Sequence, residues 1–369
     1  MRPILALASN IQIHHFLTLR ICAIFCNVYT ILSNENRMPL PIARKTLRTF
    51  ILLFAGLTCS TSLFAKEPHK VCAIYPHLKD SYWLSVNYGM VDEARKLGVD
   101  LRVLEAGGYP HHDKQQQQLS LCTRWGADAI ILGTVAPELY FSSLKQYVGN
   151  TPVFATVNKL LVDNTNHQVL KGEVGVDWYW MGYYTGKYLK DKHPKGSGKT
   201  NIVILPGPKS SGGTKPVMVG LIAALKESDI NILDTFWADN DKELQRNLVQ
   251  QTIDNYDVDY IVGSAVAIEA AISELRAANK SDQIGLVSTY LSHGVYRGLL
   301  RKRVEFAPTD KMVLQGRLSM RQAIAYLNET PFKKIEAPII EALTPNNLNP
   351  TVVADSLSPS EYRPTFYTN

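Results

Sequence analysis

Short apolar segments alternate with longer amphipathic segments along most of this chain, and this alternation restricts the fold more than any other feature. The apolar segments predict buried strands, at residues 71–75, 100–104, 129–132, 153–156 and 173–176. The segments between the first four strands, at 82–97, 113–125 and 138–148, have the length and spacing of helices. A strand–helix order of this kind predicts a parallel sheet with helices on both faces.

The same alternation begins again after residue 178. Helices are expected at 179–189, 242–255, 265–277, 295–300 and 311–327, with one more ending at Leu225. Strands are expected at 201–205, 231–237, 260–262, 285–288, 304–307 and 335–343. The chain is therefore predicted to be an α/β protein with two doubly wound parallel-sheet lobes. Open sheets of this kind bind ligands beyond the carboxyl ends of their strands, so two facing lobes would share one cleft.

The first 65 residues differ from the rest and indicate an export signal. Arg44, Lys45 and Arg48 precede the apolar run at 50–57, which is too short to cross a bilayer as a helix. We predict cleavage after Ala65 and a translation start at Met38; an N-terminal membrane helix is the alternative. Beyond this signal we find no run of 18 apolar residues, which predicts a mature periplasmic protein without membrane insertion.

Charge and cysteine content exclude some classes of protein. The net charge of +6 arises mostly in the first 65 residues, and the remainder is nearly balanced, so no nucleic-acid partner is expected. The cysteines form no CxxC motif and no histidine cluster accompanies them, so no metal site is predicted. Cys72 and Cys122 follow the signal, and either a disulfide or two buried thiols is compatible with an exported chain.

Two strand–loop–helix segments resemble type I periplasmic binding proteins. In the first, Asp80-Ser81-Tyr82-Trp83 follows Tyr75-Pro76; in the second, Asp177 precedes Gly182 and Gly186. The resemblance implies three crossings between the lobes, near 174–177, near 305–309 and after Pro331. It therefore implies an N-terminal lobe of 70–176 and 309–332, and a C-terminal lobe of 177–308 and 333–369.

A narrower resemblance concerns the ligand. The runs SYWLSVNYGM, GVDLRVLEAGGY, WGADAIILG, QRNLVQ and YLSHGVYRGL are similar to members of this family that bind trimethylamine N-oxide (TMAO). Those members work with a membrane sensor histidine kinase in two-component signal transduction. The resemblance implies TMAO as the ligand and the periplasmic sensor domain of such a kinase as the partner.

Aromatic and acidic residues cluster where the predicted strands end. The expected ligand-binding residues are Asp80, Tyr82, Trp83, Tyr109, Trp178, Tyr290 and Asp310. Aromatic ring faces attract methylated ammonium groups, so we expect Tyr82, Trp83, Tyr109 and Trp178 to form the walls of an aromatic cage. Tyr290 and an indole N–H would donate to the oxide oxygen. Asp80 and Asp310 would face the methylated nitrogen or orient other donors.

Each of these residues also has a purely structural interpretation. The aromatic side chains could belong to the core, and Asp177 or Asp310 could cap the helix that follows it. Tyr109 could pack on a surface loop, and Tyr290 could cover the edge of a sheet. The sequence alone leaves these alternatives open.

No motif indicates catalysis. The loop from Gly207 to Lys215 lacks the ending of a phosphate-binding loop, and Ser210 and Ser211 lie outside any Gly-x-Ser-x-Gly elbow. His111 and His112 have no matching carboxylate motif. We therefore expect no enzyme and no cofactor. The alternative to a sensor is the solute-binding component of an ABC transporter for a methylated amine, such as betaine or choline, or for a sugar.

Overall fold

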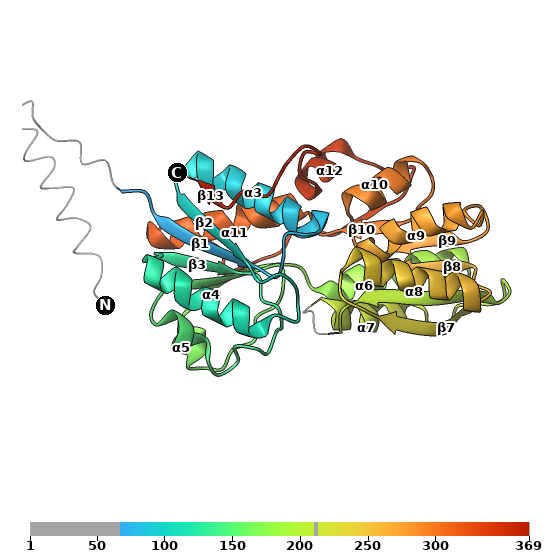
Figure 1. The fold of residues 1–369 in the computed structure, drawn as a ribbon, viewed down its shortest axis with the longest axis horizontal. Coiled ribbons are helices and arrows are strands. Elements are labelled where there is room, and N and C mark those ends of the chain that lie inside the picture. The colour runs from blue at the N-terminus through green and yellow to red at the C-terminus, as the bar shows by residue number, and fades with distance from the viewer. Residues whose placement is uncertain (1–66, 210–212, 369) are drawn as a thin grey trace, which may run out of the picture. The chain divides into compact units, whose positions relative to one another are not determined.

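The parallel sheet predicted for the first lobe is present. The structure, a computed structural model, describes residues 67–209 and 213–368, so the predicted signal, its cleavage site and Met38 lie outside the described residues. The sheet has seven strands in the order β11-β5-β4-β3-β1-β2-β13. Figure 1 labels β1, β2, β3 and β13 of this sheet. Their bounds are β1 Lys70–Tyr75, β2 Asp100–Glu105, β3 Ala129–Leu132, β4 Val153–Thr156, β5 Leu170–Val174, β11 Ile335–Glu336 and β13 Tyr367–Thr368.

Alternate residues of β1 contact different helical layers. Val71 and Ala73 belong to the core shared with α3 (Ser81–Leu97) and α11 (Met312–Leu327). Cys72 and Ile74 belong to the core shared with α4 (His112–Trp125) and α5 (Leu144–Val148). Because successive side chains of a strand point to opposite faces, the wholly apolar segment predicted as a strand is buried on both sides.

The second lobe repeats this plan with four parallel strands in the order β7-β6-β8-β9. Ile202 and Ile204 of β6 pack toward α6 and α7, whereas Val203 and Leu205 pack in the core shared with α8 and α9. The strands are β6 Thr200–Gly207, β7 Ile230–Trp237, β8 Tyr260–Gly263 and β9 Gly285–Ser288. The helices are α6 Trp178–Lys192, α7 Thr214–Ala224, α8 Lys242–Asn255, α9 Ala265–Ala277 and α10 His293–Leu300.

The strand order of each sheet reverses beside its first strand. In the first lobe, β1 lies between β2 and β3; in the second, β6 lies between β7 and β8. At such a reversal the connecting helices leave on opposite faces, which opens a crevice beyond the carboxyl ends of the strands. The two crevices are the expected halves of a ligand site.

The crossings between the lobes agree in part with the prediction. The first joins β5 to α6, the second runs through β10 (Ala307–Thr309) into α11, and the third links β11 to β12 (Glu341–Leu343). Strands β10 and β12 pair antiparallel and form a separate two-stranded sheet. The described residues include no helix that is long and apolar enough to cross a membrane.

The assignment of 333–369 to the second lobe is wrong at two places. Strand β11 pairs with β5, and β13 pairs antiparallel with β2, so both join the first sheet. Figure 1 shows β13 beside β2. The helix α12 (Pro350–Ser356) packs against α11. The chain end therefore covers the open edge of β2, which protects an edge that would otherwise expose unpaired backbone groups.

Three other element predictions are wrong in detail. The helix expected at 138–148 is limited to α5, because residues 138–143 form turns. The late strand expected at 335–343 is split into β11 and β12, with Pro338 between them; proline removes a backbone donor from a ladder. The strand expected at 304–307 is β10, which starts at Ala307.

Glycines bring one helix pair in each lobe into close contact. A Cβ atom on Gly89 of α3 would lie 2.0 Å from the carbonyl oxygen of Val313 in α11. A Cβ atom on Gly220 of α7 would lie 1.9 Å from the carbonyl oxygen of Tyr179 in α6. Both distances are too short for any side chain, so these glycines set the separation of α3 from α11 and of α6 from α7.

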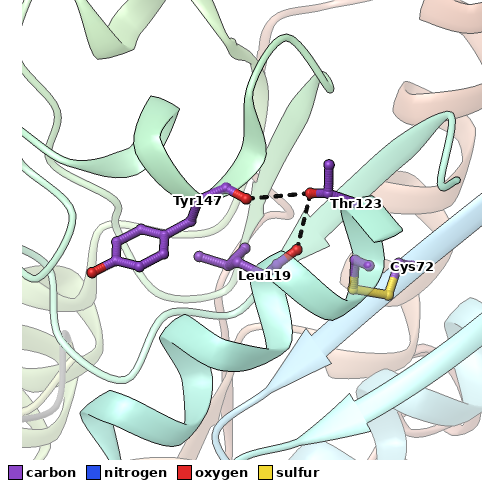
Figure 2. The surroundings of a disulfide bond; sticks show 5 residues. Cys72, Leu119, Thr123 and Tyr147 are labelled. Atoms are coloured by element: carbon purple, nitrogen blue, oxygen red, sulfur yellow. Dashed lines mark hydrogen bonds between the residues drawn. A yellow bond between two sulfur atoms is a disulfide. The ribbon is translucent and has the colours of Figure 1, made fainter. Parts of the chain in front are cut away.

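A disulfide joins the first strand to a helix on one face of its sheet. Cys72 of β1 and Cys122 of α4 are bonded, with their Cα atoms 5.7 Å apart (Figure 2). Beside Cys122 in α4, the Thr123 hydroxyl donates to the carbonyl oxygens of Leu119 and Tyr147. Of the two possibilities left by the sequence, the structure contains the disulfide.

Removing this bond should destabilise the chain. The bond closes a loop across a sequence separation of 50 residues, and cross-linking such a loop contributes about 4 kcal/mol by restricting the unfolded chain. We expect Cys72→Ala/Cys122→Ala to lose roughly this free energy of unfolding in a urea titration. Dithiothreitol should lower the parent's stability similarly and leave the variant unchanged. Equal unfolding midpoints for parent and variant would contradict the role assigned to the bond.

Candidate ligand site

A small cavity lies where the carboxyl ends of the strands of both lobes meet. Its volume is about 40 Å³, which is space for roughly three water molecules. Six of the seven predicted residues line it, all except Asp310. The described residues that line it are Asp80, Tyr82, Trp83, Tyr109, Val157, Asn158, Trp178, Pro206, Gly213, Thr214, Val217, Asn240, Thr289 and Tyr290. In this conformation the site is suited to a compact solute and is too small for a hexose.

Aromatic rings from the two lobes contact one another around the cavity. Tyr82, at the start of α3, lies 5.9 Å from Trp178 of α6 and 5.4 Å from Tyr290, measured between ring centroids. Trp178 and Tyr290 are 6.4 Å apart and nearly perpendicular. Trp83 packs edge-on against Tyr82. All four side chains are at least nine-tenths buried, so the ring faces act in a poorly solvated setting where they attract a cation most strongly.

Glycines support two of these rings. A Cβ atom on Gly133, directly after β3, would lie 2.5 Å from the Trp83 indole. A Cβ atom on Gly213, before α7, would lie 2.8 Å from the Trp178 indole. Each indole therefore rests on a position where only hydrogen fits, and this contact determines how far the ring reaches into the cleft.

The hydrogen bonds of the rings correct one prediction. The Trp83 Nε1–H donates to the Tyr109 hydroxyl at 3.2 Å, and the Trp178 Nε1–H points to the Val157 carbonyl oxygen at 3.4 Å. The expectation of a free indole N–H as donor to the ligand oxygen is therefore wrong in this structure, because both groups are used within the protein.

The Tyr290 hydroxyl, unlike the two indole N–H groups, has no acceptor among the described residues. Its hydroxyl oxygen is buried and makes no hydrogen bond with a described residue. Burial raises the pKa of Tyr290 well above its usual range, and the neighbouring Ser264 opposes that shift only in part. The hydroxyl thus stays protonated at neutral pH. A buried donor without a partner carries a free-energy penalty that a ligand oxygen would remove.

Asp310 lies behind the cavity wall instead of lining it. Its carboxylate accepts hydrogen bonds from the Tyr82 hydroxyl at 2.5 Å and from Gln315 Nε2 at 2.7 Å. Burial raises the pKa of Asp310, and the two hydrogen bonds oppose this. Burial likewise raises the pKa of Tyr82 well above 10, and the nearby Asp310 carboxylate adds to the shift. Asp310 therefore holds the Tyr82 ring in place.

Asp80 caps a helix and also lines the cavity. Its side chain accepts from the Trp83 backbone N–H and so caps α3, and it also lines the cavity. The buried His77 ring lies 3.8 Å from the same carboxylate. Asp177 caps α6 by accepting from the Tyr179 N–H and does not line the cavity.

The prediction missed several residues that line the cavity. Asn158 follows β4, Pro206 lies near the end of β6, Asn240 follows β7 and Thr289 follows β9. All lie near strand ends, so the rule that placed the aromatic residues could have found them. The prediction covered only aromatic and acidic side chains at strand ends, so it omitted these residues. Asn240 Oδ1 is buried without a hydrogen-bond partner among the described residues and is thus a second unsatisfied group at the cavity.

Polar contacts across the cleft hold the lobes together. Lys79 Nζ lies 3.0 Å from an Asp239 carboxylate oxygen, and the His293 backbone N–H donates to the Ser81 hydroxyl at 3.1 Å. Lys79 and Ser81 flank α3 of the first lobe, whereas Asp239 and His293 belong to the second. The rings and these contacts together join the two lobes around the cavity.

Comparison with known proteins agrees with this geometry. The family described as periplasmic binding proteins and sugar binding domain of the LacI family matches residues 68–360. The chain belongs to this family. As a periplasmic binding protein, it has the two-lobed type I fold expected from the sequence.

Relatives of this binding protein narrow the comparison. The chain is 44% identical over 310 residues to the periplasmic protein TorT of Escherichia coli K12, covering 84% of this chain and 87% of TorT. The corresponding protein of E. coli O157:H7 matches equally well. These relatives confirm the predicted periplasmic location and the narrower sequence resemblance.

Solved structures resemble it as well. Crystal structures of a TorS sensor domain–TorT complex without ligand and with TMAO contain a chain that is 68% and 69% identical, with TM-scores of 0.77. Each match covers 81% of this chain and 99% of the other. An ABC transporter solute-binding protein from Bradyrhizobium sp. BTAi1 with bound bis-tris is 32% identical, with a TM-score of 0.68; the match covers 82% of this chain and 90% of the other.

The support that Asp310 gives to Tyr82 can be tested in this binding protein. Tyr82→Phe removes the donor to a buried carboxylate, which should lower the free energy of unfolding by about 1–3 kcal/mol. The loss should become smaller as the pH falls from 7 to 4, because a raised pKa increases the neutral fraction of Asp310 at low pH, and a neutral carboxyl needs the donor less. Urea titrations at both pH values measure it.

The exposed Tyr184→Phe is the matched control and should stay within about 0.5 kcal/mol of the parent. A Tyr82→Phe loss that is equally large at both pH values would contradict the dependence of this hydrogen bond on the charge of Asp310.

Proposed function

We propose that this chain captures TMAO in the cavity between its lobes and presents its closed form to the periplasmic sensor domain of a TorS-like histidine kinase, so that TMAO induces its own anaerobic respiration. The observation that carries the proposal is the aromatic cavity of about 40 Å³, with rings from both lobes. Proteins that are 68–69% identical occur in complexes with the TorS sensor domain, one of them with TMAO.

The chemistry of the site matches the ligand in two parts. TMAO has a cationic nitrogen with three methyl groups, which the faces of Tyr82, Trp83 and Trp178 would surround. Its anionic oxygen needs a donor, and the unpartnered Tyr290 hydroxyl would provide one. Asp80 would lie toward the methylated nitrogen, because a carboxylate beside the oxygen would repel it.

Binding would be coupled to lobe closure because the rings that form the cavity walls come from both lobes. Tyr82 and Trp83 belong to the first lobe, whereas Trp178 and Tyr290 belong to the second, so the complete cage exists only when the lobes are closed. A ligand that binds the closed form more tightly shifts the population toward it. The kinase would respond to that shift. We propose no catalytic step.

The role of an ABC transporter component is less well supported. The transporter relative is 32% identical, against 68–69% for the proteins from the TorS complexes. Among the described residues, the cavity lining contains five aromatic rings and a single acidic side chain, Asp80, which disfavours a sugar. Calorimetric titration with TMAO, glycine betaine, choline and ribose separates these ligands; binding of ribose without any heat from TMAO would refute the proposal.

The aromatic wall can be tested with two tryptophans of the same helix. Trp178→Ala removes a ring from the cage, and the lost cation–π contact should weaken TMAO binding about 2- to 30-fold. Trp180→Ala, on the exposed side of α6, is the matched control and should bind as the parent does. Titration calorimetry measures both, and equal affinities for the two variants would contradict the cage.

The oxygen donor is tested separately. Tyr290→Phe keeps the ring and removes the hydroxyl, so TMAO affinity should fall about ten- to a hundredfold, as for a hydrogen bond to a charged group. Tetramethylammonium has no oxygen to accept the bond, so its affinity should change little. A similar loss for both ligands would show that Tyr290 acts through packing and not as a donor.

A further inference from the structure

The outer side of α6 carries a cluster of aromatic rings that the ligand site does not use. Tyr179, Trp180, Tyr183 and Tyr184 contact one another in five ring pairs, with centroids 5.3–6.5 Å apart. Trp180 is 46% exposed and Tyr184 is 37% exposed. Among the tryptophans of the described residues, Trp180 is the one classed as exposed.

An apolar side chain of α7 extends this cluster. Val219 is 59% exposed, and it precedes Gly220, whose Cα approaches the backbone of Tyr179 and Tyr183. Val219 is therefore the exposed residue next to the point where α7 contacts the backbone of α6. We call these five residues, four from α6 and Val219 from α7, the α6 surface. Exposed clusters of tryptophan and tyrosine are typical of protein–protein contacts, where they provide much of the binding energy.

The position of the α6 surface relates it to the ligand. Helix α6 follows the first crossing between the lobes and starts at Trp178, whose ring lines the cavity. Trp178 and Trp180 thus place one ring inside the cleft and one outside, two residues apart on the same helix. A protein bound to the α6 surface would contact the element whose position depends on lobe closure.

We propose that the α6 surface docks the kinase sensor domain, an inference that rests on the proposed function. The partner should present an apolar patch to the rings and a carboxylate opposite Lys215, which is exposed one turn before Val219. The kinase would then bind the open and closed forms of this protein differently, because the position of α6 relative to the first lobe differs between them.

The test uses the TorS sensor domain of the solved complexes as the probe, with binding measured by titration calorimetry in saturating TMAO. Trp180→Ala/Tyr184→Ala should weaken sensor-domain binding about tenfold or more while leaving TMAO affinity unchanged. The matched control is Phe366→Ala/Tyr367→Ala, which removes the exposed aromatic pair at the chain end of the first lobe. It should bind the sensor domain within about twofold of the parent.

The outcomes separate the inference from the function on which it rests. If the parent binds both TMAO and the sensor domain, and the α6 variant binds the sensor domain equally well, the α6 surface is not the docking site. A loss confined to the chain-end variant, or a dimer of the parent that the α6 variant dissociates in sedimentation, would also overturn it. If the parent itself binds neither TMAO nor the sensor domain, the proposed function fails instead.

Discussion

The close approach of two helix pairs determines where the ligand site can form. Gly89 lets α3 contact α11, and Gly220 lets α7 contact α6, each at a distance that no side chain would permit. The starts of α3 and α6 carry Trp83 and Trp178 at the cleft. Asp310 lies just before α11 and fixes Tyr82. The aromatic walls are thus positioned by backbone packing, which is stiffer than the loops that usually carry binding residues.

Because both lobes contribute to the cavity, binding of the ligand is coupled to closure of the lobes. Neither lobe alone surrounds a methylated cation, since Tyr82 meets Trp178 and Tyr290 only across the cleft. The unpartnered Tyr290 hydroxyl adds a free-energy penalty to the closed form that a ligand oxygen would remove. A solute whose oxygen accepts a hydrogen bond from this hydroxyl is therefore expected to shift the protein toward the closed form. The α6 helix, with one tryptophan inside the cleft and another outside, offers a route from the ligand to a partner.

Much of the site was predictable because it follows strand periodicity. The apolar runs located the strands, and the residues after them met at one edge, as carboxyl ends of parallel strands must. Of the two roles expected for Asp310, the structure shows the one in which it orients another donor, Tyr82, because its position after β10 is equally consistent with a lining residue and with a buried partner. The indole donors were misassigned because Tyr109 and the Val157 carbonyl come from other loops. The chain end was misplaced because β13 is two residues long.

The sequence by itself determined the two α/β lobes and the set of aromatic residues at their shared edge, since apolar periodicity and strand order are local properties of the chain. Only the tertiary structure decided which rings touch, which hydroxyl remains without a partner, and that Cys72 bonds to Cys122. These outcomes depend on distances between segments far apart in the chain. Such distances follow from packing the helices on the sheets, and no local pattern encodes them.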